Sequence, residues 1–194
     1  MGNVWVLNAS PLILLGKIGR LDLLERLAAK AVVPNAVFLE IQAGISEYQA
    51  VQSTADWAAP RRATDVPIPL SVERWDLGPG ESQVIAYCLK ETQRAVLDDA
   101  QGRQCASAHG IAVIGTVGIV LSAKRQGMIS AARPVLETLH RSGMYLSDHV
   151  LTEGSQTDKR IAYMAMLKPW YKVVTPREDL RESVGSIPLN LSYT

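Results

Sequence analysis

The stretch that decides the fold is Ala95–Thr116, which reads AVLDDAQGRQCASAHGIAVIGT. Its apolar start, Ala95–Leu97, stops abruptly at Asp98 and Asp99, and a second apolar run, Ile111–Ile114, follows a helix-like segment. A strand, a helix and a strand in so few residues form a βαβ unit, so the two strands should be parallel. Ligands of open parallel sheets bind at the carboxyl ends of the strands, where this aspartate pair falls. Because adjacent carboxylates repel each other unless a cation joins them, we expect a divalent metal there.

The alternation of strands and helices continues along the chain and predicts an α/β fold with a mostly parallel central sheet. The first helix should be capped by Ser10 and have Pro11 in its first turn. Further strands are expected at residues 3–7, 31–33 and 62–66, and helices at 12–18, 21–29, 34–42, 46–58, 81–91, 117–125 and 134–141. Ser147 should cap a last helix that begins at Asp148.

Composition and length fit a globular domain with an appendage. The 194 residues are 47% hydrophobic and 20% charged, which is enough apolar material for a buried core. No apolar run approaches the roughly 20 residues of a membrane span, and Met1–Ser10 lacks the basic start of a signal peptide. Cys88 and Cys105 lack CxxC spacing and are expected to be small buried residues in a reducing compartment. We therefore expect a cytoplasmic protein without membrane contact.

Charge is distributed unevenly along the chain. Residues 1–99 carry 9 Lys and Arg against 12 Asp and Glu, whereas residues 100–150 carry 5 against 2. A carboxylate site beside a basic rim suits a phosphodiester substrate, with Arg103, Lys124 and Arg125 as candidates for contacting its backbone. The alternative is that these bases are solvated and that the asymmetry is due to chance.

Acidic or amide side chains recur where a strand ends or a helix begins. Asn8 follows the first strand, Glu40 lies in the apolar stretch VFLEI, and Glu81 follows Gly-Pro-Gly. Three of the acids also have a purely structural interpretation. Glu40 could face solvent, Glu81 could complement the helix dipole, and Asp99 could be a helix N-cap. Together with Asp98, these residues predict a metal site that uses oxygen ligands.

Two hydroxyl groups lie near the same strand ends. Thr116 could contact a metal-bound water or a phosphate, and Ser10 is a candidate for substrate contact as well as a helix cap rather than a nucleophile. A phosphatase with Asp98 as nucleophile would need a DxD pattern, whereas this chain has DD.

Five ordered blocks resemble the PIN (PilT N-terminus) domain family, in the branch placed with VapC-like toxins. They span about residues 3–152 and read VLNASPLILLGKIGRLDLL, VVPNAVFLEIQAG, DLGPGESQVIAYCL, VLDDAQGRQCASAHGIAVIGTVGIVLSAKRQGMI and GMYLSD. The resemblance predicts a PIN-like domain at 1–152. A C-terminal extension at 153–194 should be partly helical and then loosely ordered, since Pro169, Pro176 and Pro188 interrupt it.

The resemblance implies a three-layer α/β/α sandwich and a ribonuclease that depends on Mg²⁺ or Mn²⁺. The acids of the family fall on Glu40, Glu81, Asp98 and Asp99, while the strand-one acid position holds Asn8. It further implies a type II toxin that cleaves RNA, forms a homodimer and is neutralised by a small antitoxin protein. Since Asn8 lacks the charge of an aspartate, the alternative is an impaired RNA-binding or antitoxin-binding module.

Overall fold

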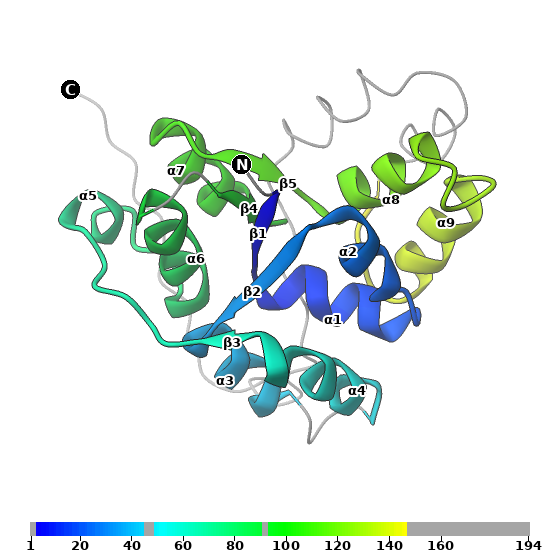
Figure 1. Cartoon of the computed structure of the whole chain (residues 1–194), viewed down its shortest axis with the longest axis horizontal. Coiled ribbons are helices and arrows are strands. Elements are labelled where there is room, and N and C mark those ends of the chain that lie inside the picture. The colour runs from blue at the N-terminus through cyan, green and yellow to red at the C-terminus, as the bar shows by residue number, and fades with distance from the viewer. Residues whose placement is uncertain (1–2, 45–48, 91–92, 147–194) are drawn as a thin grey trace, which may run out of the picture.

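The computed structural model describes residues 3–44, 49–90 and 93–146, and its centre is a five-stranded parallel sheet (Figure 1). The strands are β1 (Val4–Leu7), β2 (Lys30–Pro34), β3 (Arg62–Ala63), β4 (Arg94–Val96) and β5 (Ala112–Ile114), in the order β3-β2-β1-β4-β5. In the centre of the sheet, Trp5 pairs with Ala31 of β2 and with Arg94 of β4. The predicted parallel α/β class is confirmed.

Helices cover both faces of this sheet. In Figure 1, α6 (Pro79–Lys90) and α7 (Ala100–Ala108) lie on one side, and α1 (Ala9–Lys17), α2 (Asp22–Leu27) and α8 (Thr116–Arg125) on the other, with α9 (Arg133–Arg141) outside α8. The remaining helices are α3 (Asn35–Ala43), α4 (Gln49–Ala58), η1 (Ala59–Arg61) and α5 (Leu70–Glu73). The predicted three-layer α/β/α arrangement is therefore confirmed.

The core is built mainly from aliphatic residues. Leu7, Val96 and Leu97 at the ends of the central strands are fully buried. A second apolar cluster joins α1, α8 and α9. Cys88 and Cys105 are buried free thiols, and burial raises the pKa of Cys88 to about 12, so this thiol stays protonated.

Two predicted elements were wrong in detail. The first helix begins at Ala9, so its N-cap residue is Asn8 rather than Ser10, because extended backbone at Asn8 continues the sheet pairing through Asn8 N–H to Val96 O (3.1 Å). Strand β3 ends at Ala63 because Gln83 of α6 bonds both backbone groups of Val66. Helix α5 was not predicted. The helix expected at Asp148 lies outside the described residues.

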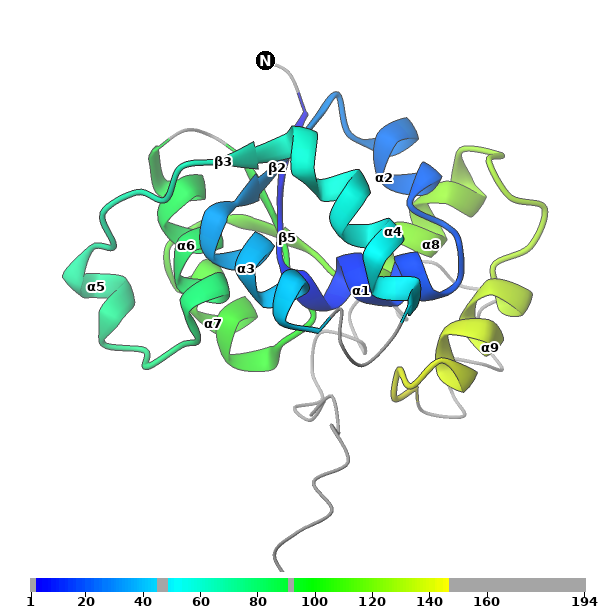
Figure 2. The ribbon, with the colours of Figure 1, turned by 90° about the horizontal axis from the view of Figure 1, so that it is seen from below.

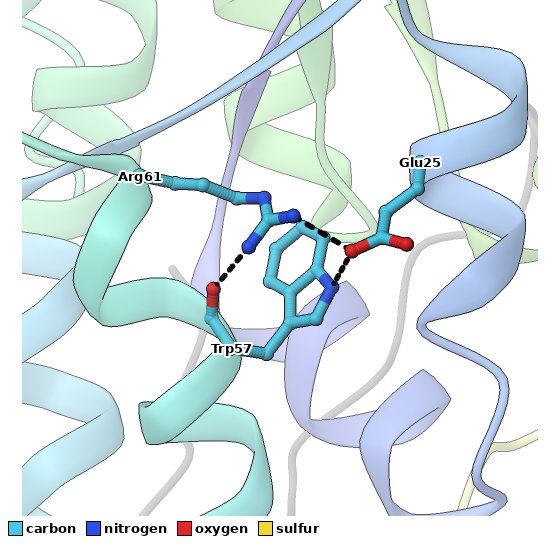
Figure 3. Close-up of polar contacts among 3 residues, drawn as sticks. All are labelled: Glu25, Trp57 and Arg61. Carbon is cyan, nitrogen blue, oxygen red and sulfur yellow. Dashed lines mark hydrogen bonds and ion pairs between the residues drawn. The ribbon is translucent and has the colours of Figure 1, made fainter.

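A polar cluster fastens α2 to the corner between α4 and η1 (Figure 3). Glu25 Oε1 accepts hydrogen bonds from Arg61 Nη2 (2.7 Å) and from the Trp57 indole Nε1 (2.8 Å). The Arg61 guanidinium lies 3.8 Å from the centroid of the Trp57 ring and donates to the Trp57 carbonyl. This cluster stabilises the edge of the domain that carries β3.

Helix α3 contacts both α1 and α6, which cover opposite faces of the sheet, so its side chains can reach the edge between them. Figure 2 shows α3 between these two helices. Helix α1 begins directly after β1, and α7 begins shortly after β4, so both start at the carboxyl edge of the sheet. Side chains from α3, from the start of α6 and from the end of β1 therefore meet at this edge.

Candidate functional site

Asn8 lies at the centre of the candidate site. It directly follows β1, and the residue is only 2% exposed. Its Nδ2 donates to Glu81 Oε1 (2.7 Å), whereas its Oδ1 is buried without a hydrogen-bond partner among the described residues. The amide must turn its nitrogen to Glu81, since the opposite orientation would set two oxygens against each other. A buried acceptor that lacks a donor is costly, so this oxygen points to a ligand that the protein does not itself supply.

Glu40 reaches into the same site from α3. Its Oε1 accepts a hydrogen bond from Gly80 N (2.9 Å) at the start of α6. Burial raises the pKa of the Glu40 carboxyl above its ordinary 4.5; the Gly80 N–H opposes this shift and the charge of Glu81 adds to it. Of the two sequence-based interpretations, solvent exposure or inward orientation, the structure supports the second.

Close packing around the carboxylates explains the Gly-Pro-Gly motif before Glu81. A Cβ atom at Gly80 would lie 2.5 and 2.7 Å from the two Glu40 carboxylate oxygens and 2.9 Å from Asn8 Oδ1. At Gly78, it would lie 2.5 Å from Glu81 Oε2. The three polar side chains therefore converge on backbone that carries no side chain. The sequence signal for this close packing is the Gly-Pro-Gly motif directly before an acidic residue.

Asp99 is the N-cap of α7, as one of its two predicted roles required. Its Oδ2 accepts from Gly102 N (2.7 Å). The position of a Cβ at Gly102 lies 3.4 Å from Glu81 Cγ and 3.5 Å from Asp99 Oδ2, so the first turn of α7 lies against Glu81. The structure thus brings Asn8, Glu40, Glu81 and Asp99 to one edge of the sheet.

Asp98 is turned to other partners. Its Oδ1 accepts from Thr116 N (2.8 Å) and its Oδ2 from Thr116 Oγ1 (2.5 Å), which ties the end of β4 to the start of α8. Burial raises the pKa of Asp98, and the two Thr116 hydrogen bonds and the charge of Arg103 oppose that shift. Arg103 donates to Leu97 O (3.0 Å), so its guanidinium is held within the protein.

The other predicted contact residues lie at different places. Ser10 is in the first turn of α1, and its buried Oγ has no hydrogen-bond partner within the described ranges. Lys124 and Arg125 lie in the last turn of α8, and Arg125 donates to Ser122 Oγ (3.0 Å). Since α8 starts at Thr116 and rises about 1.5 Å per residue, these two bases are roughly 12–14 Å along the helix from Thr116, the residue that binds Asp98. The structure does not bring them to the acidic residues.

The oxygen atoms that Asn8, Glu40 and Glu81 offer are the type of ligand that a hard divalent cation prefers. Within residues 3–44, 49–90 and 93–146, no three His, Cys, Asp or Glu side chains form a ready metal site. The site instead offers an unpartnered amide oxygen from Asn8 beside the carboxylates of Glu40 and Glu81. Mg²⁺ characteristically uses one or two carboxylates and fills its remaining positions with water and substrate phosphates. The residues present therefore fit such an ion.

The chain is an α/β/α sandwich with a parallel sheet and a group of carboxylates at the carboxyl edge of that sheet. Residues 4–159 match the family model DUF3368, described as a PIN domain, and the chain belongs to this family. The family predicted from the sequence is thus confirmed. No match was found among curated proteins.

One solved structure similar to this chain is that of VapBC-1 from nontypeable Haemophilus influenzae. The similarity has 13% sequence identity and a TM-score of 0.43, and it covers 58% of this chain and 98% of the other. No helix in the described parts of the chain is long and apolar enough to cross a membrane. The division at residue 152 falls outside those parts and stays a prediction.

Proposed function

We propose that the chain is a metal-dependent ribonuclease that hydrolyses phosphodiester bonds within RNA. The observation that supports this proposal most strongly is the buried, unpartnered Asn8 Oδ1 beside Glu40 and Glu81. Membership of a PIN domain family supports the same activity. A bound Mg²⁺ or Mn²⁺ would activate a water for attack on the phosphodiester and stabilise charge on the leaving oxygen.

Each residue of the site has a defined task in this proposal. Asn8 Oδ1 and Glu40 would contact the ion, and the neighbouring carboxylates of Glu81 and Asp99 would add negative charge to the site. The Gly80 N–H fixes the Glu40 carboxylate, and the Asn8 amide fixes that of Glu81. Asp98, which the sequence predicts as a further ligand, has both oxygens bonded to Thr116, so we assign it the task of holding the start of α8.

We further propose, from family membership alone, that the protein is the toxin of a type II toxin–antitoxin pair. A small antitoxin protein and a second copy of this chain would then be its partners, and the cytoplasm its location. Arg103, Lys124, Arg125, Ser10 and Thr116 stay predicted RNA contacts.

The test is cleavage of mixed RNA substrates by purified protein with Mg²⁺, Mn²⁺ or EDTA. We expect cleavage that depends on metal and falls at least about 100-fold in Asp99→Asn, which keeps a good N-cap and removes the charge. A matched control is Asp56→Asn, which removes an exposed acid on α4 that accepts from Gln52 Nε2. Cleavage in EDTA, or full cleavage by Asp99→Asn, would contradict the proposal.

The second candidate function is a binding module that has lost productive metal chemistry. The observation that favours it is the amide at position 8, which donates to Glu81 where an acid would bind metal. In that case wild type binds RNA or antitoxin without cleaving RNA, and Asn8→Asp gains cleavage. Cleavage by wild type decides for the first candidate.

A further inference from the structure

The nitrogen and the oxygen of the Asn8 side-chain amide have different surroundings. The nitrogen end is used inside the protein, since Nδ2 donates to Glu81 Oε1 at 2.7 Å. The oxygen end is free: Oδ1 is buried, has no donor among the described residues, and lies 2.9 Å from the Cβ position at Gly80 that the Glu40 oxygens also crowd. A carboxylate in this place would offer an oxygen to both neighbours, whereas the amide offers one oxygen, on the Glu40 side.

This asymmetry restricts where a cation can bind. An amide NH₂ group carries two hydrogens with partial positive charge and has no lone pair available for a metal. A cation therefore cannot bridge position 8 and Glu81 through Nδ2, because that nitrogen already points at Glu81 Oε1. Any cation that contacts residue 8 must do so through Oδ1, which lies around the same Cβ position of Gly80 as the Glu40 carboxylate oxygens.

The same hydrogen bond holds the site together in the absence of metal. Glu40 and Glu81 are like charges brought close by Gly80, and such carboxylates separate unless something positive lies between or beside them. The Asn8 N–H supplies partial positive charge to Glu81, and the Gly80 N–H supplies it to Glu40. Hydrogen bonds to ionised groups are about twice as strong as neutral ones.

We propose that the Asn8 amide takes the place of one cation, so that the site is assembled without metal and binds a single divalent ion on its Glu40 side. The inference rests on the proposed function for the presence of a divalent ion in this site. It adds the number of ions, the side on which the ion binds and a role for Asn8 as a positioning residue.

The experiment uses the full chain without RNA and has two readouts. Mn²⁺ binding, followed by electron paramagnetic resonance of the free ion, gives the number of ions bound, and thermal unfolding in EDTA gives the stability of the metal-free site. We expect one Mn²⁺ per wild-type chain. Asn8→Asp should lower Tm in EDTA by roughly 5 °C, because it replaces a charge-assisted hydrogen bond with repulsion. The same variant should bind Mn²⁺ about tenfold more tightly, through the added ligand charge.

Two further variants separate this role from a general loss of folding. Asn8→Asp combined with Glu81→Gln restores an amide–carboxylate pair with its direction reversed, and should recover the Tm lost in EDTA even where Asn8→Asp alone folds poorly. Asn35→Asp is the matched control, since Asn35 Nδ2 also donates to a carboxylate, Asp65 Oδ2 (3.3 Å). This control should leave the number of Mn²⁺ ions unchanged.

The possible failures are distinguishable. Two Mn²⁺ ions per wild-type chain, or an unchanged Tm of Asn8→Asp in EDTA, would overturn the inference and leave the ribonuclease proposal intact. A double variant no more stable than Asn8→Asp would also overturn it. Absence of Mn²⁺ binding together with absence of RNA cleavage would overturn the ribonuclease proposal itself, and this inference with it.

Discussion

Replacing Gly80 with alanine should disable the site while the fold survives. The added Cβ would lie 2.5 and 2.7 Å from the Glu40 carboxylate oxygens, well inside ordinary contact distances. Backbone at Gly80 is fixed within α6, whereas Glu40 ends in a flexible carboxylate, so the carboxylate moves, by about 1 Å. That movement also breaks or stretches the Gly80 N–H bond to Glu40 Oε1.

The magnitudes differ between stability and activity. A hydrogen bond to a charged group contributes about 1.5–3 kcal/mol to stability. Alanine offsets about 1 kcal/mol of this loss, because glycine is unfavourable in a helix. We expect a net loss of about 0.5–2 kcal/mol in the free energy of unfolding. Misplacing a catalytic group by about 1 Å typically costs about 100-fold in rate, so cleavage and Mn²⁺ affinity should fall far more than stability does.

These effects are measured by urea unfolding, Mn²⁺ binding and RNA cleavage. Two controls, Gly102→Ala and Gly44→Ala, add the same methyl group where there is room for it. At Gly102, the nearest side-chain atom to an added Cβ is 3.4 Å away, and at Gly44, which follows α3, the nearest atom is Ile41 O at 3.5 Å. Both replacements should bind Mn²⁺ and cleave RNA within about threefold of wild type. Gly80→Ala with wild-type Mn²⁺ affinity and cleavage would refute the reasoning, since Glu40 would then have no role at its observed position.

Three further predictions concern the neighbouring contacts. Because burial raises the pKa of Glu40 above 4.5, the wild-type chain in EDTA should lose stability as pH rises from 4.5. Glu40→Gln should therefore be more stable than wild type at pH 7 but not at pH 4, as urea unfolding would show. Equal effects at both pH values would contradict this. Thr116→Val leaves Asp98 Oδ2 without its donor and should cost about 1–3 kcal/mol in urea, which Thr116→Ser should restore. Arg61→Lys loses the planar contact over Trp57 and should cost about 1 kcal/mol without changing RNA cleavage; loss of cleavage would show that this edge of the domain belongs to the site.

The sequence predicted the fold well because its signals are local. The apolar run before Asp98 and the second run at Ile111–Ile114 became β4 and β5, in parallel as expected. The N-cap role of Asp99 was one of its two predicted roles, and the bond from Gly102 N bears it out. Such features depend on residues only a few positions apart.

The site itself depends on residues far apart in the chain. The sequence could not show whether the Glu40 side chain points inward or to solvent, because the N–H that holds it belongs to Gly80, forty residues later. The partner of Asp98 could not be predicted either, since Thr116 lies 18 residues later in the chain, beyond α7 and β5. The split role of the Asn8 amide required the position of Glu81. Tertiary contacts, rather than local pattern, decide these points.

The most direct measurement is X-ray diffraction from crystals soaked in Mn²⁺, with anomalous scattering locating the ion. We predict one Mn²⁺ in contact with Asn8 Oδ1 and Glu40 at the carboxyl edge of the sheet. Anomalous density beside Asp98 and Thr116 instead, or none at this edge at saturating Mn²⁺, would contradict the proposal that these residues form the metal site of a ribonuclease.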